Sequence, residues 1–547
     1  AGCHATSGWI RCEPWPDAGE YALSHLNMQK PNDGDTPPES PESPEPSLSA
    51  YLNKNLDMLR GIFSISSDIV IRELAFGQQP QVHAALIYVD GLVDKATINL
   101  SIIKPLMYDS RIISPEKAHK ENIDHVKTTL LSVGDVKQTS LINKLVDDCM
   151  SGDTIMLIDG HDEALAISAK AWENRGVQEP ETENVVRGPR EGFSETLRTN
   201  TSLIRRKIKN PDLIFETMKI GNRTKTDVCI AYLQGVVNPA LVNEIKSRLK
   251  RIDTDAILES GYIEQYIEDA PYSIFPTIAN SEKPDVVAAN LLDGRAAIMI
   301  DGTPFVLTVP ALFIESFQAS EDYYSRSFLS SIIRMIRYIS YMLTILTPAT
   351  YFAILTYHPE LLPTPLLFTL MASEEGLPFP LFLELILMVI IFDILREAGV
   401  RLPRPIGQAI SIMGALVIGE AAVAAGIVSD FTVIVIAATA VSSFVNPAQT
   451  DSASILRYIL LIVSAVMGGF GIIIGLICVL IHLVTLRSFG TPYLSPLAPF
   501  VAQDQKDVFI RAPLWSMTTR PANIGAQDSK NQASGLKPRP PKEENNI

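Results

Sequence analysis

Closely spaced cysteines are missing from this sequence. Its five cysteines lie far apart and none belongs to a CxxC pair: Cys3, Cys12, Cys149, Cys229 and Cys478. Disulfide scaffolds and zinc sites both depend on closely spaced cysteines. The pattern therefore favours buried thiols in a reducing compartment, and no metal site is predicted.

A basic surface and the common catalytic motifs are also missing. The net charge is −15, whereas nucleic-acid binding needs a concentration of Lys and Arg. The chain has no GxxxxGK(S/T) phosphate loop, no GxSxG nucleophile turn and no HExxH zinc motif. We therefore predict no nucleic-acid partner, no enzymatic activity and no cofactor.

The first 47 residues offer little apolar surface to bury. The chain opens on Ala1, and residues 1–27 lack the basic and apolar stretches of a signal peptide, so we expect Met28 to be the true start. Residues 31–47 are mostly Pro, Glu and Ser, which is typical of disorder. Residues 1–47 are interpreted as a disordered leader.

What the chain does contain is an internal duplication. Tyr88–Val93 resembles Tyr232–Val237 at an offset of 144, and Asp153–Gly160 resembles Arg295–Gly302 at an offset of 142. Such similar offsets predict two copies of one fold. The predicted units are an α/β repeat 1 (48–184), a basic connector (185–210) and an α/β repeat 2 (211–330).

Both copies are predicted to have the same order of elements. Apolar periodicity and Asp-Gly turn signals indicate a helix, a strand, a second helix and a closing hairpin. These are the first helix (Ser67–Phe76; Pro211–Met218), the strand (Ala84–Val89; Val228–Tyr232), the second helix (Lys95–Leu106; Pro239–Ile252) and the hairpin (Thr154–Ile167; Ala296–Val309).

One acidic cluster in repeat 1 could bind a metal. It runs from Asp159 to Glu163 and contains His161. The second copy keeps Asp301-Gly302 but continues with Thr and Pro, so the turn is retained and the ligands are not. We therefore interpret the cluster as a hairpin turn.

The connector carries seven Lys or Arg residues between 187 and 209. Such a stripe could bind anionic lipid, contact an acidic neighbouring subunit, or simply be solvated. The run from Arg187 to Phe193 favours an interface between subunits. The candidate interface residues are Arg187, Arg190 and Glu191.

Residues 331–487 are predicted to form an α-helical multi-pass membrane domain, followed by a polar, Pro-rich tail (488–547). A span needs ~20 apolar residues. The apolar runs are Ile339–Thr356, Phe379–Leu395, Ile406–Val428, Phe431–Val445 and Ile455–Leu486. As one helix the last run would be about 48 Å long against a ~30 Å core. Gly468–Gly471 divides it, so a re-entrant hairpin or one tilted helix are both possible, with four to six crossings in all.

Lys and Arg near the ends of the runs predict the orientation. Arg334 and Arg337 place the repeats in the cytoplasm. Arg396, Arg401 and Arg404 place the turn after the second run there too, and we interpret this as a turn that couples the membrane part to the repeats. Basic residues in the tail favour a cytoplasmic tail.

The third run is the candidate pore helix. On a 3.6-residue helix one face carries Ala409, Met413, Val417, Glu420 and Ile427. A ring of Glu420 above a constriction of Val417 and Met413 would give cation preference and a hydrophobic gate. The alternative is that Glu420 pairs with a neighbouring helix and only fixes packing.

Two acids lie within the second run, where a charge is costly. Asp393 is spaced for an ion pair with Arg396, three residues later. Glu384 has no predicted partner.

Several motifs together resemble the A subunits of GerA-type spore germination receptors. They are VRGPREGF (186–193), GYIEQYIEDAP (261–271), FPTI (275–278), DGTP (301–304), EDYY (321–324), LREAGVRLP (395–403), GALVIGEAA (414–422) and SFGTPYLSP (488–496). A close relative in that family is the AF-type protein of the stage V sporulation complex, which is associated with dipicolinate release.

The resemblance implies a multi-pass protein of the spore inner membrane that forms a homo-oligomeric cation channel. It also implies a transporter-like B subunit that senses the nutrient, a lipoprotein C subunit and membrane lipids as partners. Two alternatives stay open, a non-conducting scaffold and an accessory subunit of the dipicolinate-release complex. A secondary transporter would require an inverted membrane repeat, and the only repeat we find is in the soluble part.

Overall fold

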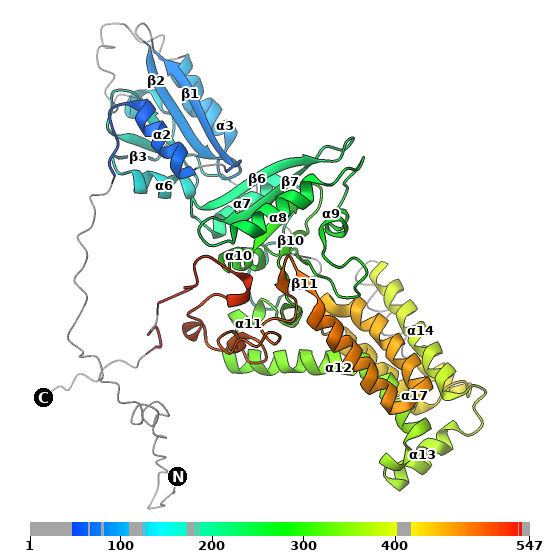
Figure 1. Ribbon diagram of the computed structural model, residues 1–547. Coiled ribbons are helices and arrows are strands. Elements are labelled where there is room, and N and C mark those ends of the chain that lie inside the picture. The colour runs from blue at the N-terminus through cyan, green and yellow to red at the C-terminus, as the bar shows by residue number, and fades with distance from the viewer. Residues whose placement is uncertain are drawn as a thin grey trace, which may run out of the picture. The chain divides into compact units, whose positions relative to one another are not determined.

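Two antiparallel five-stranded sheets make up the first part of the chain (Figure 1). The structure is a computed structural model that describes residues 46–63, 66–77, 81–108, 123, 126–171, 180, 183, 185–401, 417–533 and 535–538. The predicted leader therefore lies outside the described residues, apart from its last two positions.

The two sheets have the same topology, which confirms the predicted duplication. Their strand orders are β1-β2-β4-β5-β3 and β6-β7-β9-β10-β8. The first sheet contains β1 (Ile69–Phe76), β2 (Val82–Val89), β3 (Val136–Thr139), β4 (Asp153–Ile158) and β5 (Ala164–Ser168). The second contains β6 (Leu213–Ile220), β7 (Thr226–Leu233), β8 (Ala279–Ser281), β9 (Ala296–Ile300) and β10 (Val306–Val309). The predicted strands and closing hairpins are confirmed as β2, β7, β4–β5 and β9–β10.

The first predicted helix of each copy is wrong. Ser67–Phe76 contains strand β1 and Pro211–Met218 contains most of strand β6, and each strand pairs antiparallel with the next one. In β1, Ile69 and Ile71 pack into the core on one face of the sheet, and Leu74 and Phe76 pack into the core on the other. Because helices cover both faces, apolar residues occur on both sides of the strand, and this spacing imitates a helical period.

Helices cover both faces of each sheet. In repeat 1, α2 (Leu52–Phe63) and α6 (Ile142–Met150) pack on one face, and the continuous helical segment α3 (Lys95–Thr97), η1 (Ile98–Ile103) and α4 (Lys104–Met107) packs on the other. Their counterparts are α7 (Leu197–Lys207) and α10 (Pro284–Leu292) on one face, and α8 (Pro239–Lys250) and α9 (Ser260–Ile267) on the other. The predicted second helices are confirmed.

The predicted connector contains a helix of repeat 2, so its description as a connector was wrong there. Helix α7 buries Leu203 and Ile204 against the second sheet, as α2 does in the first. The first backbone N–H of each helix is capped by an aspartate from the closing hairpin, Leu52 N by Asp159 Oδ1 and Leu197 N by Asp301 Oδ1, both at 3.0 Å. Many basic side chains in a short segment concealed this helix.

These caps also bear on the acidic cluster of repeat 1. Asp159 and Gly160 form the turn between β4 and β5, with Gly160 at φ 87°, and Gly302 has φ 95° in the second copy. Within the described residues, no group of three or more His, Cys, Asp or Glu side chains is placed to hold a metal. The turn interpretation explains the conserved spacing of Asp and Gly in both repeats.

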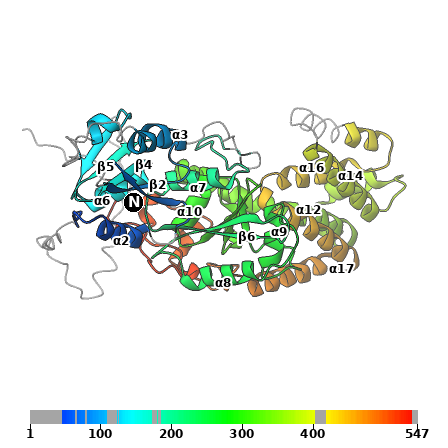
Figure 2. The ribbon, with the colours of Figure 1, turned by 90° about the horizontal axis from the view of Figure 1, so that it is seen from above.

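The second part of the chain is helical (Figure 1, Figure 2). Its main helices are α12 (Ser327–Tyr357), α13 (Thr364–Glu374), α14 (Leu381–Arg401), α16 (Asp430–Ser443) and α17 (Thr450–Thr485). Residues 417–424 are also helical. Of the described helices, α12 and the segment ending with α17 are long and apolar enough to cross a membrane.

Helix α17 is a hairpin of two antiparallel arms. Gly468 has non-helical angles, φ 60° and ψ −143°, which the Cβ of another residue would disfavour. A Cβ on Gly475 would lie 2.6 Å from Leu460, and one on Gly471 would lie 2.6 Å from the carbonyl oxygen of Val463. Gly471 and Gly475, which are spaced as a GxxxG motif, therefore allow the arms to touch, as small residues do between membrane helices.

The helices alternate in direction. One end of the bundle lies beside the sheets, where Gln449 bonds Ser316 and His482 lies 3.0 Å from the Ser273 hydroxyl. At the other end Gly468 packs on Tyr357. Both ends of α17 thus face the repeats, and its tip lies beside the end of α12.

Candidate functional sites

A buried charge cluster joins α12 to the repeats and to the tail. Arg334, fully buried, donates from Nε to Asp322 Oδ2 at 3.2 Å and from Nη1 to Asp507 Oδ1 at 2.7 Å. Arg337 donates to Asp322 at 2.8 Å, and the Tyr323 hydroxyl to Asp507 at 2.6 Å. Burial, reinforced by the Asp507 charge, raises the pKa of Tyr323 well above its usual value, so it stays a donor.

The sequence used Arg334 and Arg337 only as markers of orientation. Their acidic partners come from the EDYY motif and from the tail, which is far away in the sequence. The tail also returns to repeat 2, where Arg520 donates to Leu292 O at 2.7 Å and Gln527 N to Val236 O at 2.8 Å. If α12 moved relative to the repeats, the ion pairs and hydrogen bonds of this cluster would therefore have to break, or their acidic partners would have to move with α12.

A second cluster lies between α14 and α17. Arg457 donates from Nη2 to both oxygens of Asp393, at 2.8 and 2.9 Å, and the Tyr458 hydroxyl donates to the same carboxylate at 2.5 Å. The predicted pair with Arg396 also forms, but at a longer distance of 3.9 Å, and Arg396 donates a hydrogen bond to Ser454 at 3.1 Å. The pair of Asp393 and Arg457 could have been identified from the sequence, because each is an isolated charge in a different apolar run and the two charges are opposite.

Arg457 is almost completely buried, with a side chain 1% exposed. Its Nε and Nη1 have no acceptor in the described part of the chain. A buried guanidinium depends on its carboxylate, because an unpaired charge in a low-dielectric interior is costly. The ion pair between Asp393 and Arg457 therefore holds α14 and α17 together.

Glu384, which had no predicted partner, caps a helix. It is 1% exposed and accepts a hydrogen bond from the backbone N–H of Ser429, the N-cap residue of α16. The positive end of the helix dipole favours a carboxylate there. The acid thus fixes the turn before α16 against α14.

Only part of the candidate pore helix is described. Ala409, Met413 and Arg404 lie outside the described residues. In 417–424, Gly419 packs on Val433 of α16, whereas Val417 is 56% exposed and Glu420 is also exposed. Ile427 is 36% exposed in the turn that follows. The described residues of the candidate face, Val417, Glu420 and Ile427, are therefore not covered by the described helices.

The predicted coupling turn follows the Asp393 cluster. Arg396 bonds Ser454 of α17, and Arg401, 77% exposed, pairs with Glu397 at 2.6 Å. Within the described part of the chain, neither residue forms a hydrogen bond or ion pair with the repeats.

The candidate interface residues lie near the start of α12 and the end of α7. Glu191 pairs within the subunit with Arg206 at 3.1 Å and with Lys207 at 3.7 Å. Arg187 and Arg190 are exposed. Arg187 and Arg190 are thus the exposed charged residues of the predicted contact between subunits, which stays a prediction.

The most buried ion pair of α7 was not predicted. Arg205 of α7 is fully buried and donates to Asp68 of repeat 1, from Nε at 2.9 Å and from Nη2 at 3.0 Å. It also donates to the carbonyl oxygens of Asn210 and Leu213, each at 2.9 Å. This arginine therefore locks the two repeats together.

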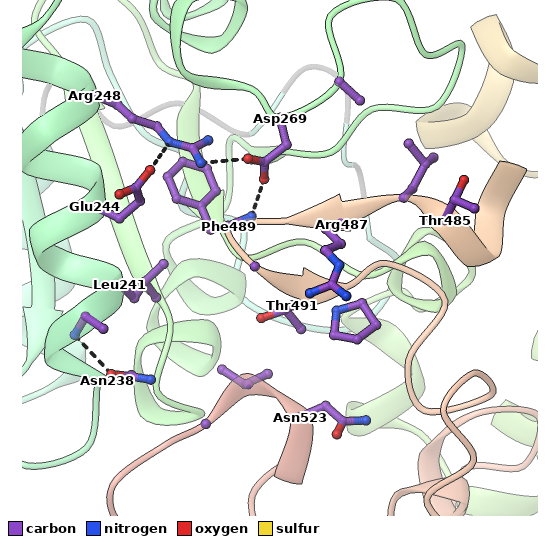
Figure 3. Close-up of a pocket in the computed structure, with 17 residues that line it drawn as sticks. Asn238, Leu241, Glu244, Arg248, Asp269, Thr485, Arg487, Phe489, Thr491 and Asn523 are labelled. Atoms are coloured by element: carbon purple, nitrogen blue, oxygen red, sulfur yellow. Dashed lines mark hydrogen bonds and ion pairs between the residues drawn. The ribbon is translucent and has the colours of Figure 1, made fainter.

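A pocket of about 830 Å³ lies where repeat 2, the end of α17 and the tail meet (Figure 3). Arg248 of α8 forms one wall, donating to Glu244 at 2.8 Å and to Asp269 at 2.6 Å and lying over the Phe489 ring at 4.2 Å. The opposite wall contains Arg487 of β11 (Arg487–Ser488).

The SFGTPYLSP motif builds this wall. Strands β11 and β12 (Thr491–Pro492) form a two-residue hairpin whose turn residues both have positive φ, 47° at Phe489 and 86° at Gly490. A bulky residue in this region is strained. Asp269 holds it by accepting the Phe489 backbone N–H, and Arg248 stacks on its ring.

The comparisons with known proteins agree with the motifs. Residues 57–523 match the family model described as Bacillus/Clostridium GerA spore germination protein. The chain belongs to the GerA family. Spore germination protein KA of Bacillus subtilis is 48% identical over 90% of this chain and 90% of its own length. GerLA of Bacillus cereus is 38% identical over 88% and 97%, respectively.

Two further proteins are similar to this chain. YfkQ of Bacillus subtilis, named an uncharacterized membrane protein, is 42% identical over 91% of this chain and 96% of its own length. The crystal structure of the N-terminal domain of the A subunit of the Bacillus megaterium spore germinant receptor GerK3 is 39% identical, with a TM-score of 0.38. It covers 50% of this chain and 99% of that domain.

Proposed function

We propose that this GerA-family chain is the channel-forming A subunit of a germinant receptor, placed in the spore inner membrane with its repeats in the cytoplasm. The alternating directions of α12, α14, α16 and the two arms of α17 support this topology, and the predicted run Ile406–Val428, of which residues 417–428 are described, would supply a sixth crossing. An even number returns the tail to the side of the repeats, as its contacts with them require.

One observation carries the channel proposal. Glu420 is exposed on an apolar helical segment and has no hydrogen bond or ion pair within the described residues. A charged side chain facing lipid is costly, roughly 2.5–3.5 kcal/mol at a helix centre on insertion scales. Glu420 is therefore expected to face water or a second copy, and a ring of copies would place it along a pore above Val417.

The test measures potassium release from liposomes that contain the reconstituted receptor. Glu420→Gln should lower cation selectivity, and Val417→Asn should raise the resting leak by hydrating the constriction. Glu360→Gln, an exposed acid in the loop after α12, is the matched control and should behave like the wild type.

Two results would contradict the proposed channel. If both variants assemble normally and release potassium as the wild type does, the pore assignment is wrong. A reconstituted complex that recruits a transporter-like B subunit and a lipoprotein C subunit but never conducts would favour a scaffold.

A further inference from the structure

Arg487 is an uncompensated cation in a built pocket. In the described part of the chain its exposed side chain forms no ion pair and no hydrogen bond. Both carboxylates of the pocket, Glu244 and Asp269, are already engaged by Arg248. Figure 3 shows Arg487 near Thr491 and apart from that group. The unpaired charge on this side of the pocket is therefore positive.

An exposed apolar stripe leads to this cation. It runs along the second arm of α17, where side chains at helical spacing are between 49% and 59% exposed: Ile473, Ile477, Leu480, Ile481 and Val484. The helix ends at Thr485, and Arg487 follows two residues later. A ligand with an acyl chain and an anionic head would match both features in their order along the helix.

We propose that this pocket binds the phosphodiester headgroup of an anionic membrane lipid. The guanidinium of Arg487 would bind the phosphate oxygens, a geometry that suits arginine, and the Thr491 hydroxyl lines the same space. The acyl chains would lie along the α17 stripe. A volume of about 830 Å³ is within the usual range for ligand pockets. Basic pockets beside membrane helices bind anionic lipid heads for the same reason.

This inference rests on the proposed membrane topology, and its position suggests a role. The pocket's walls come from α8 of repeat 2, the end of α17 and the tail. A bound headgroup would therefore contact all three parts at once. The strained turn at Phe489 fixes the Arg487 wall, so the site is formed before the lipid arrives.

The experiment counts lipids bound to the purified full chain by native mass spectrometry, using phosphatidylglycerol and phosphatidylcholine in separate titrations. Wild type should prefer phosphatidylglycerol. Arg487→Ala should weaken phosphatidylglycerol binding about tenfold or more, the effect of losing one charge-assisted contact. Arg487→Lys should retain part of the preference. Arg401→Ala, an exposed arginine on another helix end, is the matched control and should leave it unchanged.

Three outcomes would overturn the proposal. The first is equal phosphatidylglycerol binding by wild type and Arg487→Ala. The second is equal loss in Arg487→Ala and Arg401→Ala, which would indicate general surface charge. The third is displacement of the lipid by millimolar glycerol phosphate together with equally tight binding of glycerol phosphate alone, which would identify a free phosphate as the ligand. Flotation of the chain with liposomes tests membrane insertion separately, so failure of the topology and failure of this site are distinguishable.

Discussion

The ion pair between the repeats allows a sharp stability test. Asp68→Asn removes the only carboxylate that meets the Arg205 guanidinium among the described residues, and both side chains are at most 1% exposed. Breaking a buried pair by removing one partner costs about 3–5 kcal/mol, because the remaining charge is buried without compensation. For domains of 150–250 residues each kcal/mol lowers Tm by about 2–4 °C, so a decrease of roughly 6–20 °C is expected.

The assay is thermal unfolding of the purified chain, followed by circular dichroism. Asp255→Asn is the matched control, since its pair with Arg223 at 3.1 Å is mostly exposed, with side chains 65% and 82% exposed. Such surface pairs contribute about 0–1 kcal/mol. If Asp68→Asn and Asp255→Asn lower Tm by the same small amount, the ion pair between Arg205 and Asp68 does not hold the repeats together.

Two further predictions concern other buried charges. Burial and two neighbouring carboxylates raise the pKa of Glu264 to about 7, so the folded chain favours its protonated form and loses stability as the pH rises from about 4.5 through 7. Glu264→Gln should remove this loss, so that the variant is more stable than the wild type by on the order of 3 kcal/mol at pH 8 but not at pH 4. The measurement is thermal unfolding of both proteins at the two pH values. The same Tm difference between variant and wild type at pH 4 and pH 8 would contradict the prediction. Asp393→Asn should destabilise the helical part by about 3–5 kcal/mol, because it leaves the buried charge of Arg457 without its carboxylate. In size-exclusion chromatography after heating, the detergent-solubilised Asp393→Asn variant should lose its monodisperse peak at a lower temperature than the control variant Glu397→Gln. Equal temperatures for the two variants would show that the ion pair does not hold α14 and α17 together.

Local patterns were sufficient for some features and not for others. The repeated Asp-Gly turn identified the duplication because both hairpins need an aspartate cap and a glycine with positive φ. The strands β1 and β6 were mistaken for helices because each places apolar residues on both faces of its sheet, which hides the period of two. The acid Glu384 could not be assigned, since its partner is a backbone N–H, and backbone groups leave no signal in a sequence.

The sequence by itself determined the family, the duplication, the long apolar segments and the division of α17 at Gly468, because each depends on spacing along the chain. Only the tertiary structure decided which charges meet. Arg457 joins Asp393 across 64 residues, Arg205 joins Asp68 across 137, and Arg334 joins Asp507 across 173. Such pairs form wherever packing excludes water from both side chains, and that depends on how distant helices and sheets lie against each other.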